Sequence, residues 1–271
     1  MKSPFLLRAL ILLIAYTFLY LPIIFLIVFS FNASRLPGVW SEFSIQWYQK
    51  LFENDALLTS VSTSLQIAAL TATLAMVLGT LGAIAMVRVR SFKGRTLFSG
   101  LISAPLVMPE VITGLALLLT FVTLERLIGW PSQRGMLTVI IAHTTLSMAY
   151  VYIIVRSRLQ DFNYSLEEAA LDLGAKPFTV FTRITLPIIA PALVSGWLLS
   201  FALSLDDVVI ASFLSGPGST TLPLLIFSNV RLGITPEINA LATLIVGIVS
   251  ISVTIVGVIM LRQQRKRQLS E

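Results

Sequence analysis

Three acidic residues lie inside long apolar stretches of the sequence, where a carboxylate needs either a partner or a path for water. They are Glu110, Asp206 and Asp207. A carboxylate near the centre of a bilayer costs about 2.5–3.5 kcal/mol to insert, so such residues commonly face a bundle interior or a water-filled path. A path lined by carboxylates attracts cations and repels anions. The three acids therefore predict a pathway for a small cation, or else anchors between helices or in the outer headgroup layer.

The two adjacent aspartates are expected to differ in what they face. On a continuous helix, Asp206 and Asp207 point about 100° apart. Asp207 continues a polar stripe that begins with Ser200 and Ser204, whereas Asp206 shares its face with Leu203. We therefore predict that Asp207 faces the pathway and that Asp206 packs or pairs within the bundle.

The third acid, Glu110, closely follows Pro105 and Pro109. Proline lacks a backbone donor and kinks or ends a helix, so this pattern predicts an interrupted helix. Interrupted helices at membrane depth are tolerated where they line a cavity. The context favours a place for Glu110 beside the pathway.

The sequence contains a single histidine, His143, and no cysteine. A protein metal site commonly needs several such ligands, and nothing in the sequence supplies the others. A nucleophile paired with a base is not evident either. We predict no metal, no catalytic residue and no enzymatic activity, and we expect His143 to make a hydrogen bond between helices.

These residues belong to a chain that is too apolar for a water-soluble fold. Of its 271 residues, 56% are hydrophobic and 12% are charged, with a mean hydropathy of +0.90; soluble proteins average roughly 25% charged residues. A membrane span needs about 20 mainly apolar residues. Six stretches meet this length: 9–31, 60–87, 97–124, 135–155, 188–214 and 238–261. We predict an all-α, polytopic membrane protein that forms one transmembrane domain over residues 1–271.

The basic residues predict the orientation, because cytoplasmic ends of spans are enriched in lysine and arginine. With the N-terminus inside, the basic residues cluster near Lys2 and Arg8 and within 88–95, 156–183 and 262–267. The outer segments then contain only five of the 19 basic residues, namely Arg35, Lys50, Arg126, Arg134 and Arg231. We predict both termini in the cytoplasm. The same placement explains the net charge of +6, so membrane lipid is an expected partner and nucleic acid is not.

The segment between the fourth and fifth spans, residues 156–187, is long for a simple connection. Ser165 followed by Glu168 fits a capping box at a helix start, and Gly174 fits the helix C-terminus. Pro177 suits the first turn of a second short helix. We predict a cytoplasmic helix–turn–helix element. On pattern alone, it is either an interfacial hairpin or a docking element for a soluble partner.

This loop also resembles a family motif. Glu168-Ala169-Ala170, then Gly174, then Ile184-Thr185-Leu186-Pro187 match the E-A-A-x3-G-x9-I-x-L-P motif of permeases from binding-protein-dependent ABC importers at every fixed position. In that family, the loop seats a short coupling helix in a cleft of the nucleotide-binding subunit. The resemblance implies an ATPase-coupling loop that includes Glu167, Glu168, Ala169, Ala170, Gly174, Ile184, Leu186 and Pro187.

The resemblance further implies a type I ABC importer permease fold in a bacterial inner membrane, in line with the six stretches found above. ATP and magnesium would then bind a separate ATPase chain and no cofactor would bind this one, which has no phosphate-binding glycine motif. The implied partners are ABC ATPase subunits, a second homologous permease subunit and a periplasmic polyamine-binding protein.

Three further stretches, 104–109, 204–213 and 237–243, are similar to permease subunits of polyamine importers, with the putrescine type favoured over the spermidine type. The similarity implies that the acids of the spans line a polyamine pathway that works by alternating access. The alternative hypothesis is an ion-coupled secondary transporter of a small organic cation. The lack of an evident inverted repeat and the presence of the loop both count against it.

Overall fold

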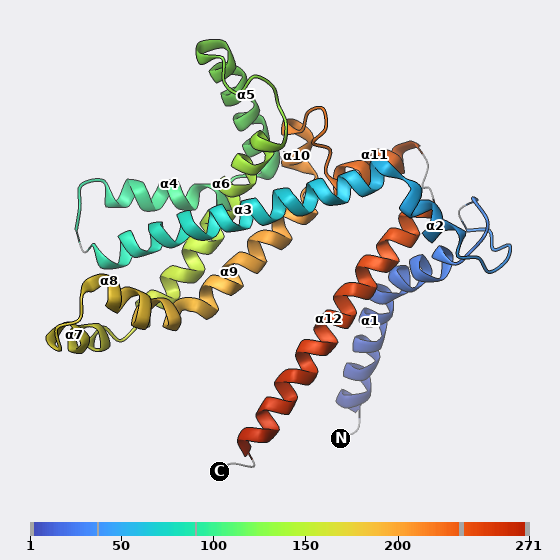
Figure 1. Ribbon diagram of the computed structural model, residues 1–271. Coiled ribbons are helices and arrows are strands. Elements are labelled where there is room, and N and C mark those ends of the chain that lie inside the picture. The colour runs from blue at the N-terminus through green and yellow to red at the C-terminus, as the bar shows by residue number, and fades with distance from the viewer. Residues whose placement is uncertain (1–2, 37, 90, 233–235, 269–271) are drawn as a thin grey trace. The chain divides into compact units, whose positions relative to one another are not determined.

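The computed structural model describes residues 3–36, 38–89, 91–232 and 236–268. These residues are mostly helical, and they contain no β-strand, only one isolated antiparallel bridge between Asn32 and Phe43. The all-α prediction is confirmed. Lys2 and Arg90, which entered the charge argument, lie outside the described residues. In chain order (Figure 1), the helices are α1 (Ser3–Ser30), α2 (Gln46–Glu53), α3 (Asp55–Arg88), α4 (Arg95–Val107), α5 (Glu110–Ile128), α6 (Met136–Gln160), α7 (Ser165–Asp172), α8 (Pro177–Val180), the π-helical turn η1 (Phe181–Thr185), α9 (Leu186–Asp206), α10 (Val209–Leu214), α11 (Leu222–Leu232) and α12 (Pro236–Gln268).

Five helical segments in the described part of the chain are long and apolar enough to cross a membrane. They overlap the first five predicted spans and are Leu7–Ser30, Asp55–Arg88, Glu110–Ile128, Met136–Gln160 and Pro177–Asp206. The sixth predicted span, 238–261, lies within α12, whose described apolar segment Pro236–Ser252 is shorter than the other five.

Two of the predicted spans are interrupted. The span predicted at 97–124 is divided into α4 and α5 at Met108 and Pro109, so the interruption that the prolines predict is confirmed. The span predicted at 188–214 is divided as well, because α9 ends at Asp206 and α10 begins at Val209. The sequence reasoning did not predict this second break, which contains no proline and consists of Asp207 and Val208.

Helix α6 belongs to a compact unit formed by residues 59–227, in which it contacts α4, α5, α9 and α10. Its Val151 packs between glycines of two other helices. A Cβ built on Gly79 of α3 would lie 2.8 Å from Val151 Cβ, and one on Gly196 of α9 would lie 3.4 Å from its methyl carbons. Such small residues let helix backbones approach closely in membranes. Buried clusters extend along α6 in both directions, around Tyr152 and around Val139.

A second compact unit is formed by residues 1–58 and 228–271. Within it, α12 packs against α1 and α2. Trp47 of α2 is 2% exposed and donates its indole N–H to the backbone oxygen of Asn32 over 2.6 Å. Each unit is compact through its own contacts. The prediction that residues 1–271 act as one transmembrane domain stays a prediction.

Candidate functional site

The first helix of the loop, α7, begins differently from the sequence prediction. Ser165 is its first helical residue, and no side chain caps the helix at Tyr164, the residue before it. The side-chain oxygen of Asn163 instead accepts hydrogen bonds from the Ser165 backbone N–H at 3.1 Å and from its hydroxyl at 2.8 Å. The predicted capping box is therefore wrong, because Asn163 had already satisfied the groups of Ser165 from two residues upstream.

The reversal after α7 follows the prediction. Gly174 has a φ of +84°, a left-handed conformation that glycine adopts at little cost. The backbone N–H of Ala175 bonds to Ala170 O at 3.0 Å, and that of Gly174 bonds to Leu171 O at 2.9 Å. These are the two bonds of a Schellman motif. Pro177 is then the first residue of α8, as predicted.

The two adjacent glutamates of α7 have different surroundings. Glu167 is 8% exposed, and its Oε1 accepts hydrogen bonds from Arg88 Nη2 at 2.5 Å and from the Thr185 hydroxyl. Glu168 is exposed. The resemblance implied that both residues belong to the coupling surface. The carboxylate of Glu167 is bound within the chain, whereas the side chain of Glu168 is exposed. A role of either glutamate in coupling stays a prediction.

The rest of the motif lies partly on the surface of the loop and partly beneath it. Ala169, Gly174 and Pro187 are exposed, whereas Ala170, Ile184 and Leu186 are half-buried. Sequence reasoning missed the most exposed apolar side chain of this loop, Leu173, which is 89% exposed, and gave no surface role to Phe178, which is 77% exposed. Their signal was a pair of large apolar side chains close to the expected reversal at Gly174.

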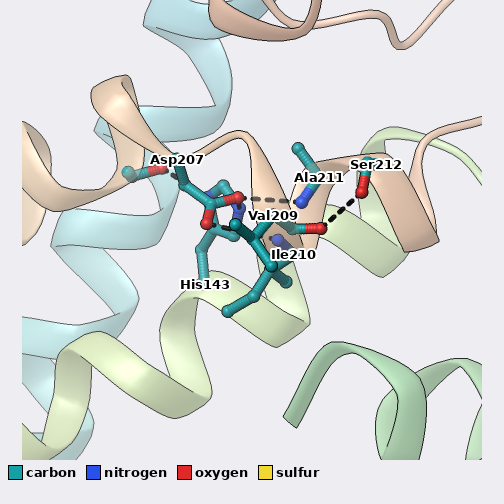
Figure 2. A network of polar contacts seen from close by, with 7 residues as sticks. His143, Asp207, Val209, Ile210, Ala211 and Ser212 are labelled. Carbon is teal, nitrogen blue, oxygen red and sulfur yellow. Dashed lines mark hydrogen bonds and ion pairs between the residues drawn. The ribbon is translucent and has the colours of Figure 1, made fainter. Parts of the chain in front are cut away.

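The second cluster lies where α9 ends. Asp207 Oδ2 is 3.1 Å from His143 Nε2 on α6, and His143 Nδ1 is 2.8 Å from the hydroxyl of Ser204. The same carboxylate accepts the backbone N–H of Ala211 at 2.8 Å and that of Ile210 at 3.3 Å. Figure 2 shows the carboxylate of Asp207 between His143 and these two backbone groups. The predicted interhelical hydrogen bond of His143 is confirmed.

Asp207 thus satisfies two of the N–H groups that the start of α10 leaves without partners within the helix. Its side chain is only 9% exposed, whereas Asp206 is exposed. Asp207, and not Asp206, is therefore the aspartate that pairs within the bundle, because the expectation assumed a continuous helix. Which of the two faces a pathway stays a prediction. Since α9 ends at Asp206, the side chain of Asp207 reaches His143 on α6, and Asp206 is exposed as the last residue of α9.

Glu110 is exposed at the first position of α5, where the positive end of the helix dipole favours an acid. One turn further along α5, Gly114 packs against α10. A Cβ on Gly114 would lie 2.8 Å from the ring of Phe213 and 3.5 Å from Ile210 Cα. The helices that follow the two breaks therefore contact each other close to the breaks themselves. This contact brings the segments that carry Glu110 and Asp207 near each other.

No group of three or more potential metal ligands was found among the described residues. His143 uses both ring nitrogens for Ser204 and Asp207. A single imidazole engaged in this way fits a structural link between helices better than a metal ligand.

Comparison with known proteins identifies the kind of protein that shares these features. A family model described as the binding-protein-dependent transport system inner membrane component matches residues 75–269. The chain is 54% identical over 266 residues to the putrescine transport system permease protein PotI of Escherichia coli strain K12, which covers 98% of this chain and 94% of that protein. It is also 41% identical over 261 residues to the spermidine/putrescine transport system permease protein PotC of Haemophilus influenzae, covering 96% and 98% of the two chains.

Solved structures show the same fold at low sequence identity. One is a bacterial ABC transporter involved in the import of the acidic polysaccharide alginate, with a TM-score of 0.71, 18% identity, and coverage of 95% of this chain and 96% of that one. Another is a bacterial alginate ABC transporter in complex with an alginate pentasaccharide-bound periplasmic protein, with a TM-score of 0.69, 19% identity, and coverage of 94% and 93%. The expected ABC importer permease fold is confirmed.

Proposed function

This chain belongs to the family of binding-protein-dependent transport system inner membrane components, and from that membership we propose that it is a permease subunit of an ATP-driven importer of polyamines. The observation that carries the proposal is its 54% identity, over 98% of its length, to a putrescine transport system permease protein. Its 41% identity to a spermidine/putrescine permease protein is lower, so we favour putrescine over spermidine.

The acids of the interrupted spans support a cationic substrate. Helix α9 has 21 residues and is about 31 Å long at 1.5 Å per residue, so Asp206 lies at the end of the span remote from the loop. An exposed carboxylate at such a position faces water or protein rather than lipid. We assign Asp206, with Glu110, to the outer part of the cation pathway, and we assign Asp207 to holding the break that shapes it.

The loop supports an ATPase as the source of energy. Glu168, Leu173 and Phe178 are exposed around the Gly174 reversal, an acidic and apolar surface suited to a cleft in a soluble partner. A cavity of about 340 Å³ opens beside it, between Glu168 and Leu171 of α7 and the end of α3 at Arg88. ATP and magnesium bind the ATPase chain in this proposal, and this chain carries no cofactor.

The proposed assembly contains three further kinds of protein subunit, and it has a defined orientation in the membrane. A second homologous permease subunit completes the pathway, two ATPase subunits dock on the loops, and a periplasmic polyamine-binding protein delivers the substrate. The concentration of lysine and arginine at the loop side of the spans supports a cytoplasmic loop and cytoplasmic termini in an inner membrane.

Co-purification tests the proposal. A tagged chain, expressed with its neighbouring transport components, is expected to carry an ATPase subunit through purification. Gly174→Val should abolish this association, because a β-branched residue does not tolerate a φ of +84°. Gly129→Val is a matched control, since Gly129 also has a positive φ of +69° and open space around it, but lies at the end of α5. Normal insertion without any bound ATPase in the parental protein would contradict the proposal.

A further inference from the structure

Three segments that are far apart in the sequence meet at one carboxylate oxygen. Arg88 is the last residue of α3, Glu167 lies in α7, and Thr185 ends the π-helical turn η1. Oε1 of Glu167 accepts from both of the others, and Arg88 Nη2 also lies 3.2 Å from the Thr185 hydroxyl. The three residues form a closed triangle of hydrogen bonds, which we call the clamp.

The burial and the charges of the clamp residues favour strong hydrogen bonds. Thr185 is fully buried, and the side chains of Glu167 and Arg88 are 11% and 32% exposed. Hydrogen bonds between ionised groups are roughly twice as strong as neutral ones. Removing one partner from a buried pair leaves an uncompensated charge, so the arrangement resists being pulled apart.

The π-helical turn explains how Thr185 reaches the clamp. The N–H of Leu186 bonds to Phe181 O, five residues back instead of four. Such turns are rare and are frequently found at functional sites. At the end of this turn, the Thr185 hydroxyl donates a hydrogen bond to Glu167 of α7. Both ends of the docking element, α7 at Glu167 and η1 at Thr185, are therefore fixed to the end of α3.

We propose that the clamp is a positioning device that joins the docking element to α3, so that movement imposed on the loop reaches α3 directly as well as α9. The inference rests on the proposed function, because it needs an ATPase that moves the loop. It gives Arg88 and Thr185 a role in coupling, and it makes Glu167 a residue that positions the loop instead of touching the partner. Glu168, next in the chain, is left for that contact.

Charge exchange in the assembled importer tests the clamp. Arg88→Glu and Glu167→Arg should each lower the substrate transported per ATP hydrolysed by about tenfold, within the range that coupling between sites commonly takes. The double variant Arg88→Glu/Glu167→Arg should restore most of the ratio, which a merely structural loss would not do. Lys93→Glu is the matched control, because Lys93 is an exposed basic residue in the short connection between the end of α3 and the start of α4. Single variants with a normal ratio would overturn the inference.

A distance measurement keeps the inference testable if the single variants do not assemble. The chain has no cysteine, so no native residue would take up a thiol-reactive spin label. Labels are introduced at Val89→Cys and Ser165→Cys, two exposed positions beside the clamp. The distance between them should stay the same in the nucleotide-free and ATP-trapped importer. A distance that changes while ATP-driven uptake is normal would overturn the clamp alone, whereas absence of ATP-driven uptake in the parental protein would overturn the proposed function.

Discussion

Two pairs of adjacent acids, Glu167–Glu168 in the loop and Asp206–Asp207 at the break in the membrane, follow the same arrangement in different surroundings. In each pair one carboxylate is bound inside the chain and its neighbour is exposed. Glu167 fixes α7 to α3, and Asp207 fixes the α10 start to His143 on α6. The comparison teaches that an acid in a conspicuous motif is not necessarily the one that meets a partner or a substrate. The bound acid sets the backbone, and the exposed one presents the charge.

The strongest test of this comparison is the effect of removing Glu167, the bound glutamate, on the free energy of unfolding. Glu167→Ala removes the carboxylate that accepts from Arg88 and from the buried Thr185 hydroxyl. We expect a loss of about 2–3 kcal/mol in the free energy of unfolding, below the usual range for a broken buried pair because Arg88 reaches water. Glu168→Ala is the matched control and should change stability by less than about 0.5 kcal/mol. Chemical unfolding of the purified chain in detergent measures both, and equal losses would contradict the division.

In the membrane pair, too, replacing the bound acid should lower the free energy of unfolding more than replacing the exposed one, but by a smaller amount. Asp207→Ala removes an acceptor from His143 and from two backbone N–H groups, and hydrogen bonds in membrane proteins average about 0.6 kcal/mol each, so we expect a loss of about 2 kcal/mol. Asp206→Ala should leave stability close to that of the parent. Thermal unfolding of the two variants in detergent compares them, and a greater loss for Asp206→Ala would restore the original sequence prediction.

Uptake, unlike stability, should depend more directly on the exposed Asp206 than on Asp207. Asp206→Asn keeps the shape of the side chain but removes its charge, and a loss of about 1.4 kcal/mol of attraction to a cation corresponds to a tenfold lower uptake. Asp206→Glu should retain most of the uptake because it retains the charge. Initial rates of labelled putrescine uptake at equal amounts of assembled importer check this prediction, and unchanged rates in Asp206→Asn would remove this residue from the pathway.

The smallest expected effect concerns the hydroxyl at the far side of the histidine. Ser204→Ala removes one hydrogen bond to His143 Nδ1 while leaving the contact with Asp207 in place. We expect a loss of about 0.6 kcal/mol in the free energy of unfolding. A loss as large as that of Asp207→Ala, measured in the same unfolding assay, would show that Ser204 and Asp207 act as one unit.

Much of the fold follows from the sequence, because lipid imposes strict rules on length and polarity. The apolar stretches, the break at Pro109, the reversal at Gly174 and the start of α8 at Pro177 were all predicted from local chemistry. The capping of α7 was not, since the side chain of Asn163, and not that of Glu168, accepts the backbone N–H of Ser165. Local patterns cannot show which of two competing side chains wins.

The candidate site was harder to predict, because its partners come from distant parts of the chain. Nothing near Glu167 in the sequence points to Arg88, which lies 79 residues away. The break at Asp207 has no proline or glycine to mark it, and its carboxylate binds a histidine that is 64 residues away. A helical wheel that runs through such a break assigns every later residue to the wrong face.

The central claim, ATP-driven import of a polyamine, is tested most directly by uptake into proteoliposomes. Importer reconstituted with its ATPase and binding protein, with labelled putrescine on the binding-protein side and ATP on the loop side, should accumulate the label against its gradient. The account predicts that accumulation needs ATP hydrolysis and continues when a protonophore removes any proton gradient. Accumulation by this chain without an ATPase, driven by an imposed proton gradient, would contradict it.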